Sequence, residues 1–89
     1  MSPRQHESRR EPRRAAEGSV VVEFYNPQKH EIQGRLVDLS PGGFRMAHSS
    51  IELIPGMVVK FKHSSATGEA RVVWNRILEN RVETGFLIT

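Results

Sequence analysis

The stretch VDLSPGGFRM, residues 37–46, ends one β-like run and begins the next. An ordinary turn uses Asp and Ser to cap the backbone, and Gly to supply a positive φ. The spacing here offers more, because Asp38 and Ser40 lie two residues apart and would project to the same side of an extended chain. Gly43 has no Cβ, so a flat ligand could approach the backbone at that point. The stretch is therefore a candidate ligand-binding wall between two strands.

Short β-like runs separated by turn residues fill the chain from residue 18 onward, with no convincing helical period. Val20, Val22 and Phe24 share one face of the first run, and the late run has Ala70, Val72 and Trp74 on one face by the same alternation. The expected strands are residues 19–25, 31–39, 44–47, 57–63, 69–76 and 82–88. About six short antiparallel strands in roughly 70 residues predict an all-β domain that closes as a small barrel or sandwich.

Residues 1–17 differ from the rest in being polar and charged, with two prolines and no hydrophobic periodicity. We expect a flexible arm there, at least without a ligand, followed by one β domain over residues 18–89. The arm holds five arginines and three glutamates, which is +2 of the net charge of +3. Affinity for a polyphosphate grows with the number of phosphates neutralised, so this nearly neutral domain is not expected to bind nucleic acid.

Composition excludes several other classes of protein. The chain has 89 residues and a mean hydropathy of −0.47, as expected of one soluble domain. No apolar run approaches the roughly 20 residues that span a bilayer, so membrane insertion is not expected. The N-terminal residues lack the apolar segment of a signal peptide, which favours a cytoplasmic protein. With no cysteine, the chain has neither disulfides nor thiolate metal sites.

The sequence gives no indication of catalysis. The four histidines are scattered without metal-ligand spacing, and neither a triad order nor a pair of carboxylates in a plausible cleft is evident. We expect no enzyme, metal or cofactor. The single tryptophan, Trp74, lies in an expected strand. A lone tryptophan in a small β protein is more often a core residue than a stacking platform, although it can bury one edge and offer a face.

The arm carries a repeated arginine spacing. Arg9 and Arg13 form an R-x-x-x-R pair, and so do Arg10 and Arg14. A guanidinium group can bind the Hoogsteen edge of guanine bidentately, stack on a base or pair with phosphate. The pattern alone is weak, because arginine-rich tails produce it by chance.

An R-x-x-x-R motif followed by D-x-S-x-x-G in a small all-β chain resembles the PilZ domain family, which are bacterial receptors for cyclic di-GMP. The matching residues here are Arg9, Arg13, Asp38, Ser40 and Gly43. The closing pattern ARVVWNR…VETGF is also similar to the late strands of a PilZ domain, in which a strand ending in an aromatic residue precedes a T-G-F-like strand. The resemblance covers nearly the whole chain.

The resemblance implies a six-stranded antiparallel β-barrel with the arginine arm folded over its outer surface. Arg9 and Arg13 would hold guanine edges and phosphates, with Arg10 assisting. We prefer this register to Arg10/Arg14 because the residues before the first strand then follow Arg13 at the expected distance.

The resemblance also implies the role of the turn. Asp38 and Ser40 would accept from and donate to a guanine, and Gly43 would leave room for the ligand. We add Trp74 to the candidate ligand-binding residues because its ring can offer a face. The expected function is that of a cyclic di-GMP receptor or adaptor, which orders its arm on binding and signals to a protein effector. The alternatives are a small barrel that binds RNA or single-stranded DNA, and a PilZ-like scaffold that acts only through protein contacts.

Overall fold

The structure, a computed structural model, describes residues 14–89. Most of the expected arm, including Arg9, Arg10 and Arg13, lies outside this part. The described residues form the strands Arg14–Ala15 (β1), Ser19–Tyr25 (β2), Lys29–Ser40 (β3), Gly43–His48 (β4), Val58–His63 (β5), Ala66–Ile77 (β6) and Val82–Ile88 (β7). No helix long and apolar enough to cross a bilayer occurs among residues 14–89.

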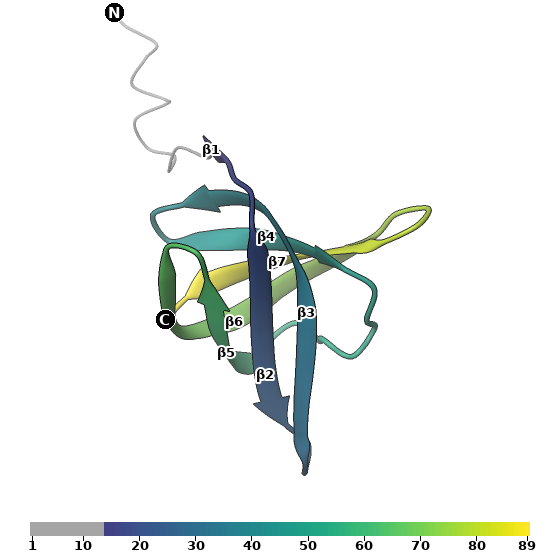
Figure 1. Cartoon of the computed structure of the whole chain (residues 1–89). Helices are drawn as coiled ribbons and strands as arrows, with labels where there is room; N and C mark the ends of the chain where they lie inside the picture. Colours follow the sequence, from purple (N-terminus) through teal and green to yellow (C-terminus); the bar gives the residue numbers. More distant parts are fainter. Residues whose placement is uncertain (1–13) are drawn as a thin grey trace, which may run out of the picture.

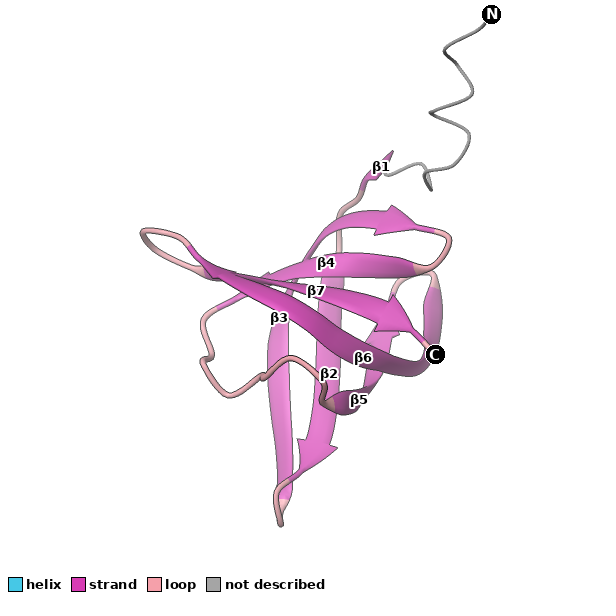
Figure 2. Ribbon diagram, turned by 180° about the vertical axis from the view of Figure 1, so that it is seen from behind, coloured by secondary structure: helices cyan, strands magenta, loops and turns pink. Residues whose placement is uncertain are grey.

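Six of the strands close into an antiparallel barrel, which confirms the fold class expected from the sequence (Figures 1 and 2). Their order is β3-β2-β5-β6-β7-β4, and β4 pairs back with β3 to complete the ring. β3 pairs with β2 along its first part and with β4 along its last part. Each boundary lies within three residues of the expected one, and β6 starts earlier because its pairing with β5 continues to the turn between them.

The seventh strand, β1, is an addition that the sequence analysis does not predict. Arg14 lies opposite Leu39, and Ala15 lies opposite Asp38. The amide of Ala16 donates a hydrogen bond of 3.1 Å to the carbonyl oxygen of Val37. Arg14 and Ala15 have no strand pattern of their own, so their extended conformation comes from pairing with the end of β3. The last residues of the expected arm are thus held against the barrel.

The core lies inside the barrel and contains the alternating residues expected from the sequence, including Val20, Val22 and Phe24 of β2. Phe44 of β4 is fully buried at the centre. Its ring centroid lies 4.6 Å from that of Phe86 and 4.9 Å from that of Phe61. These spacings are those at which aromatic rings pack favourably. The aromatic cluster therefore joins β4, β5 and β7 across the interior.

A β-bulge in β3 turns Asp38 outward. Leu36 is buried in the core, and Asp38 lies opposite Arg45 of β4, so Val37 is an extra residue in the pairing. Beyond the bulge, Leu39 again packs against the core. Without the extra residue, strict alternation would direct the Asp38 carboxylate to the same side as Leu36. The bulge therefore keeps two leucines inside and the acid outside.

A second bulge corrects the expected position of Trp74. The sequence analysis gives Trp74 the same face as Ala70 and Val72, but only those two residues are in the core. Trp74 lies opposite Gly85 of β7, with Val73 as the extra residue. The inserted residue reverses the alternation, so the indole lies on the outer surface of the barrel. Its side chain is half-buried there.

Replacing Phe44 with Ala should lower the free energy of unfolding by about 3–5 kcal/mol, because it removes a fully buried ring from three aromatic contacts. The change is measured by urea denaturation. Leu87→Ala is the control, since Leu87 is 51% exposed and its removal should cost no more than about 0.5 kcal/mol. Equal losses in the two variants would contradict this assignment of the core.

Candidate ligand-binding site

One row of residues crosses four strands on the outer surface of the barrel. Asp38 of β3 lies opposite Arg45 of β4, Arg45 lies opposite Gly85 of β7, and Gly85 lies opposite Trp74 of β6. Directly opposite residues in antiparallel strands project to the same side of the sheet. The row therefore has an acid and a base at one end, a glycine in the middle and an indole at the other end.

Arg45 holds the carboxylate of Asp38. Its Nε donates a hydrogen bond of 2.8 Å to Oδ2 of Asp38, and its Nη2 donates to the same oxygen. The hydrogen bonds to Asp38 raise the pKa of Arg45, against the opposing effect of burial. Asp38 is only 5% exposed. A buried carboxylate needs such partners, and Arg45 fixes the position of this one.

Ser40 and Gly43 lie at the end of β3 and the start of β4, next to this row. They are directly opposite each other across the β3–β4 turn, and the hydroxyl of Ser40 lies 3.4 Å from the carbonyl oxygen of Gly43, a long hydrogen bond. Because Asp38 and Ser40 lie two residues apart beyond the bulge, both belong to the outward side. The expected side-by-side arrangement of carboxylate and hydroxyl is consistent with this pairing.

Gly43 is required by the barrel itself. A Cβ at this position would lie 2.1 Å from the carbonyl oxygen of Phe86, a distance that no real side chain adopts. The positive φ values among the described residues belong to Gly18 and Gly56, so neither glycine of the β3–β4 turn is there for a left-handed conformation. The glycine allows close approach of two strands, and the backbone of β7 occupies the space that its side chain would fill. Gly43 is itself buried, so it does not provide the open surface for a ligand that the sequence analysis expects.

Trp74 lies flat over a second such glycine. A Cβ on Gly85 would lie 2.4 Å from both Cε2 and Nε1 of the indole. The guanidinium carbon of Arg76 lies 5.8 Å from the centroid of the ring, within cation–π range. One part of the indole is therefore covered by the backbone at Gly85, and the guanidinium of Arg76 lies over the ring.

Charged groups of alternating sign continue along this face. Glu83 is 4% exposed and accepts hydrogen bonds from Arg76 at 2.9 Å and from Arg81 at 2.8 Å. The hydrogen bond from Arg76 lowers the pKa of Glu83, and Arg81 acts in the same direction, so the carboxylate is kept ionised. The negative charge of Glu83 also contributes to the raised pKa of Arg45. The arginines on this face are thus partly neutralised and fixed in place.

The structure brings together three of the residues predicted for the site, because Asp38, Ser40 and Gly43 lie at the β3–β4 turn. Trp74 lies on the same outer face but is separated from Asp38 by Arg45 and Gly85. Arg9, Arg10 and Arg13 lie outside the described residues. Arg14, from the alternative register, pairs with the inward-facing Leu39, whereas its neighbour Ala15 pairs with Asp38.

Arg45 is the residue that the sequence analysis misses. It follows the turn by two residues, and hairpin pairing would have brought it close to Asp38. The described residues contain no cluster of three or more possible metal ligands.

Comparison with known proteins adds no assignment: no family model matches the chain, and no curated protein matches it either. The argument for a function therefore depends on the geometry of the outer face and on the sequence motifs.

Replacing Gly85 with Ala should displace the indole of Trp74, because the new methyl group would overlap its ring. We expect a loss of about 1–3 kcal/mol in unfolding free energy and a shift of tryptophan fluorescence to longer wavelength. Trp74 is the only tryptophan, so the emission reports on this ring alone. Gly68→Ala is the matched control, since its Cβ would meet the Phe61 ring at an ordinary 3.4 Å. Unchanged emission in Gly85→Ala would contradict the stacked arrangement.

Proposed function

We propose that this chain is a cyclic di-GMP receptor or adaptor domain. The observation that carries the proposal is that Asp38, Ser40 and Gly43 of one turn share the outer face with Trp74, in the row that β3, β4, β7 and β6 form. The D-x-S-x-x-G motif thus has a carboxylate and a hydroxyl close together, and an aromatic ring lies further along the same face, beyond Arg45 and Gly85.

The chemistry of cyclic di-GMP suits this face. The ligand has two guanines and two phosphates, so it needs hydrogen-bond acceptors for base N–H groups, cations for phosphates and flat surfaces for the rings. Asp38 would accept from a guanine, and the hydroxyl of Ser40 would supply a further hydrogen bond. Trp74 would offer a stacking face, which typically contributes about 1–3 kcal/mol per base. Arg45 would keep the Asp38 carboxylate in position.

The arginine motif enters the proposal through β1. The motif in its preferred register ends at Arg13, and β1 begins with the next residue. β1 is held against the end of β3, where Ala15 lies opposite Asp38. Arg9 and Arg13 would therefore lie close to the D-x-S-x-x-G turn, where they could bind guanine edges and phosphates bidentately.

Ligand binding would order the arm, which a protein effector would then recognise. Fixing the backbone costs about 1–2 kcal/mol per residue, so only a few residues around Arg9–Arg13 should become rigid. The divalent ligand would compensate by joining these arginines to the nearly neutral barrel. We place the receptor in the bacterial cytoplasm, and we expect it to act without catalysis, cofactor or membrane insertion.

Single-stranded nucleic acid is the competing ligand, but the described surface favours it less. Barrels that bind single strands stack successive bases on several aromatic side chains in a basic groove. Tyr25, 65% exposed, is the one strongly exposed aromatic residue within residues 14–89. Trp74 is half-buried, and its neighbouring arginines are paired with Glu83.

Titration calorimetry should detect cyclic di-GMP binding with a dissociation constant on the order of 1 μM or tighter. Arg13→Ala should weaken binding by about tenfold or more, because it removes a charge-assisted bidentate contact. Ser40→Ala should cost less and leave the fold intact. Lys29→Ala removes the same charge at the distant β2–β3 hairpin and should leave the affinity unchanged (Figure 1).

GTP and single-stranded DNA are the control ligands for this titration. Preferential binding of DNA would favour the nucleic-acid alternative. An absence of heat and of chemical-shift change at about 1 mM cyclic di-GMP would exclude the receptor and leave the protein-interaction scaffold.

Hydrogen exchange tests the ordering of the arm separately. Amides 8–13, apart from Pro12, which has no N–H, should gain protection when cyclic di-GMP binds, because the ligand would fix the backbone around the arginines. The amide of Ala16, which already donates to Val37, should be protected in both states and serves as the internal reference. If amides 8–13 are equally protected with and without ligand, the arm is preformed and binding does not act as a switch.

A further inference from the structure

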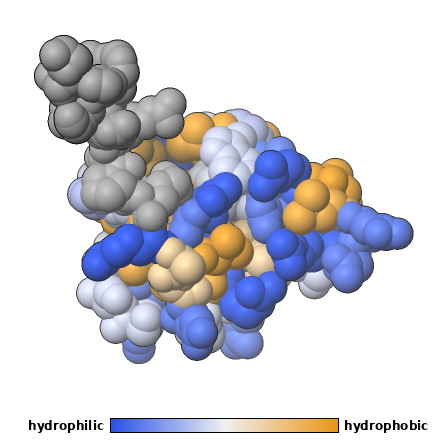
Figure 3. Space-filling model, turned by 90° about the horizontal axis from the view of Figure 1, so that it is seen from above, coloured by the Kyte–Doolittle hydropathy of each residue, from blue (hydrophilic) through white to orange (hydrophobic). Residues whose placement is uncertain are grey.

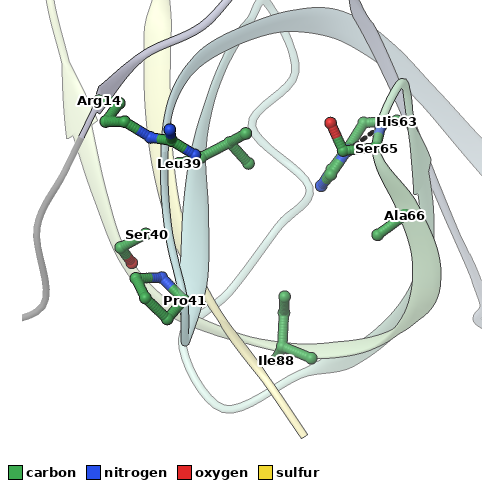
Figure 4. A pocket seen from close by; sticks show the side chains of 8 residues that line it. All are labelled: Arg14, Leu39, Ser40, Pro41, His63, Ser65, Ala66 and Ile88. Carbon is green, nitrogen blue, oxygen red and sulfur yellow. Dashed lines mark hydrogen bonds between the residues drawn. The ribbon is translucent and has the colours of Figure 1, made fainter.

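A cavity opens at one end of the barrel, on the inward side of the β3–β4 turn. Its volume is about 400 Å³, within the usual range for small-molecule sites, and barrel mouths are common positions for such sites. It lies between that turn, the β5–β6 turn, β1 and the end of β7 (Figure 4). From above, the surface shows small apolar patches set among hydrophilic side chains (Figure 3).

The lining of the cavity is divided by polarity. Figure 4 shows Arg14 on one side of the opening and Ser65 with His63 on the other, with their side chains around the same space. The rest of the lining that Figure 4 shows is largely apolar and includes Ile88 and Pro41. A cation and a hydroxyl near an apolar floor are the partners that an amphipathic anion requires.

His63 adds a donor that has no partner. Its Nδ1 accepts a hydrogen bond of 3.1 Å from the backbone amide of Ser65, so a neutral ring carries its proton on Nε2. That nitrogen is buried and has no hydrogen-bond partner among the described residues, and the residue is 8% exposed. Burial also lowers the pKa of His63, which favours the neutral ring. An unpaired buried donor is unfavourable, and it belongs to a side chain that lines the cavity.

We propose that this cavity is a second binding site, which takes a small amphipathic carboxylate with an aliphatic chain. The carboxylate lies between Arg14 and the corner formed by Ser65 and His63. The guanidinium neutralises it, and the hydroxyl of Ser65 donates to it. The chain lies against Leu39 and Ile88, where it removes apolar surface from water.

This site is distinct from the one proposed for cyclic di-GMP, although Ser40 belongs to that site and also lines the cavity. The two share the β3–β4 turn, but Asp38 faces the outer row, whereas Leu39 and the cavity lie on the inward side. The expected ligand differs as well. The lining of the cavity is largely apolar and contains one described cation, Arg14, whereas a ligand with two phosphates needs several arginines. A failure to bind cyclic di-GMP would leave the present inference intact.

The test is a titration of the full chain with octanoate, followed in the assigned ¹H–¹⁵N spectrum. We expect saturable shifts at residues 39, 63–66 and 88, with a dissociation constant on the order of 1 mM or tighter. Ala66→Trp should abolish them, because Ala66 is exposed and lines the cavity, so an indole there fills the space without entering the core. Thr67→Trp, on the other side of the same strand, is the matched control and should bind normally.

Octanol, which has the same alkyl chain as octanoate but no carboxylate, separates the contribution of the ligand's charge from that of its alkyl chain. Arg14→Gln should weaken octanoate binding by about fivefold and leave octanol binding unchanged, because only the acid pairs with the guanidinium. The inference is overturned if octanoate causes no shifts at about 10 mM, if Ala66→Trp binds as tightly as the parent chain, or if Arg14→Gln affects both compounds equally.

Discussion

Closure of the barrel depends on β3, because its twelve residues pair with three different strands. The first part pairs with β2, and the last part pairs with β4 on one edge and with β1 on the other. A closed sheet leaves no long unpaired edge, which is the usual weakness of small β proteins. Phe44 follows the turn at the end of β3 and stacks on Phe86 of β7 inside the core. This contact stabilises the closed arrangement of the strands. The β3–β4 turn, which bears candidate ligand-binding residues, therefore also connects the two strands whose pairing closes the barrel.

The candidate site exists because each of two strands contains one residue more than its partner. The bulge at Val37 directs Asp38 outward to Arg45, and the bulge at Val73 directs Trp74 outward over Gly85. Bulges commonly reorient side chains next to functional sites, and they keep the core alternation intact on both sides. Regular strands would have placed a carboxylate and an indole inside. The same two inserted residues thus keep this carboxylate and this indole out of the core and place Asp38 and Trp74 on the outer face.

The alternation of apolar residues was sufficient to predict the six strands and the fold class, because each strand buries one face. It could not predict the side on which Trp74 lies, since the bulge at Val73 is defined by the opposing strand and not by its own residues. Arg45 was missed for a related reason: its role depends on hairpin register opposite Asp38. Arg14 shows a third limit, because β1 has no strand pattern and forms only by pairing with an existing edge.

β1 lies between the two proposed binding regions and faces both of them. Ala15 lies opposite Asp38 on the outer side, and Arg14 lies opposite Leu39 and lines the cavity. A ligand in the mouth would stabilise β1 through Arg14, and a ligand on the outer face would stabilise the arm that continues from it. Each ligand would therefore reduce the conformational-entropy cost that the other ligand pays to order this segment. Thermodynamic linkage makes such an effect reciprocal. If both proposed sites bind their ligands, the two adjacent residues Arg14 and Ala15 would couple the inside of the barrel to its outer surface.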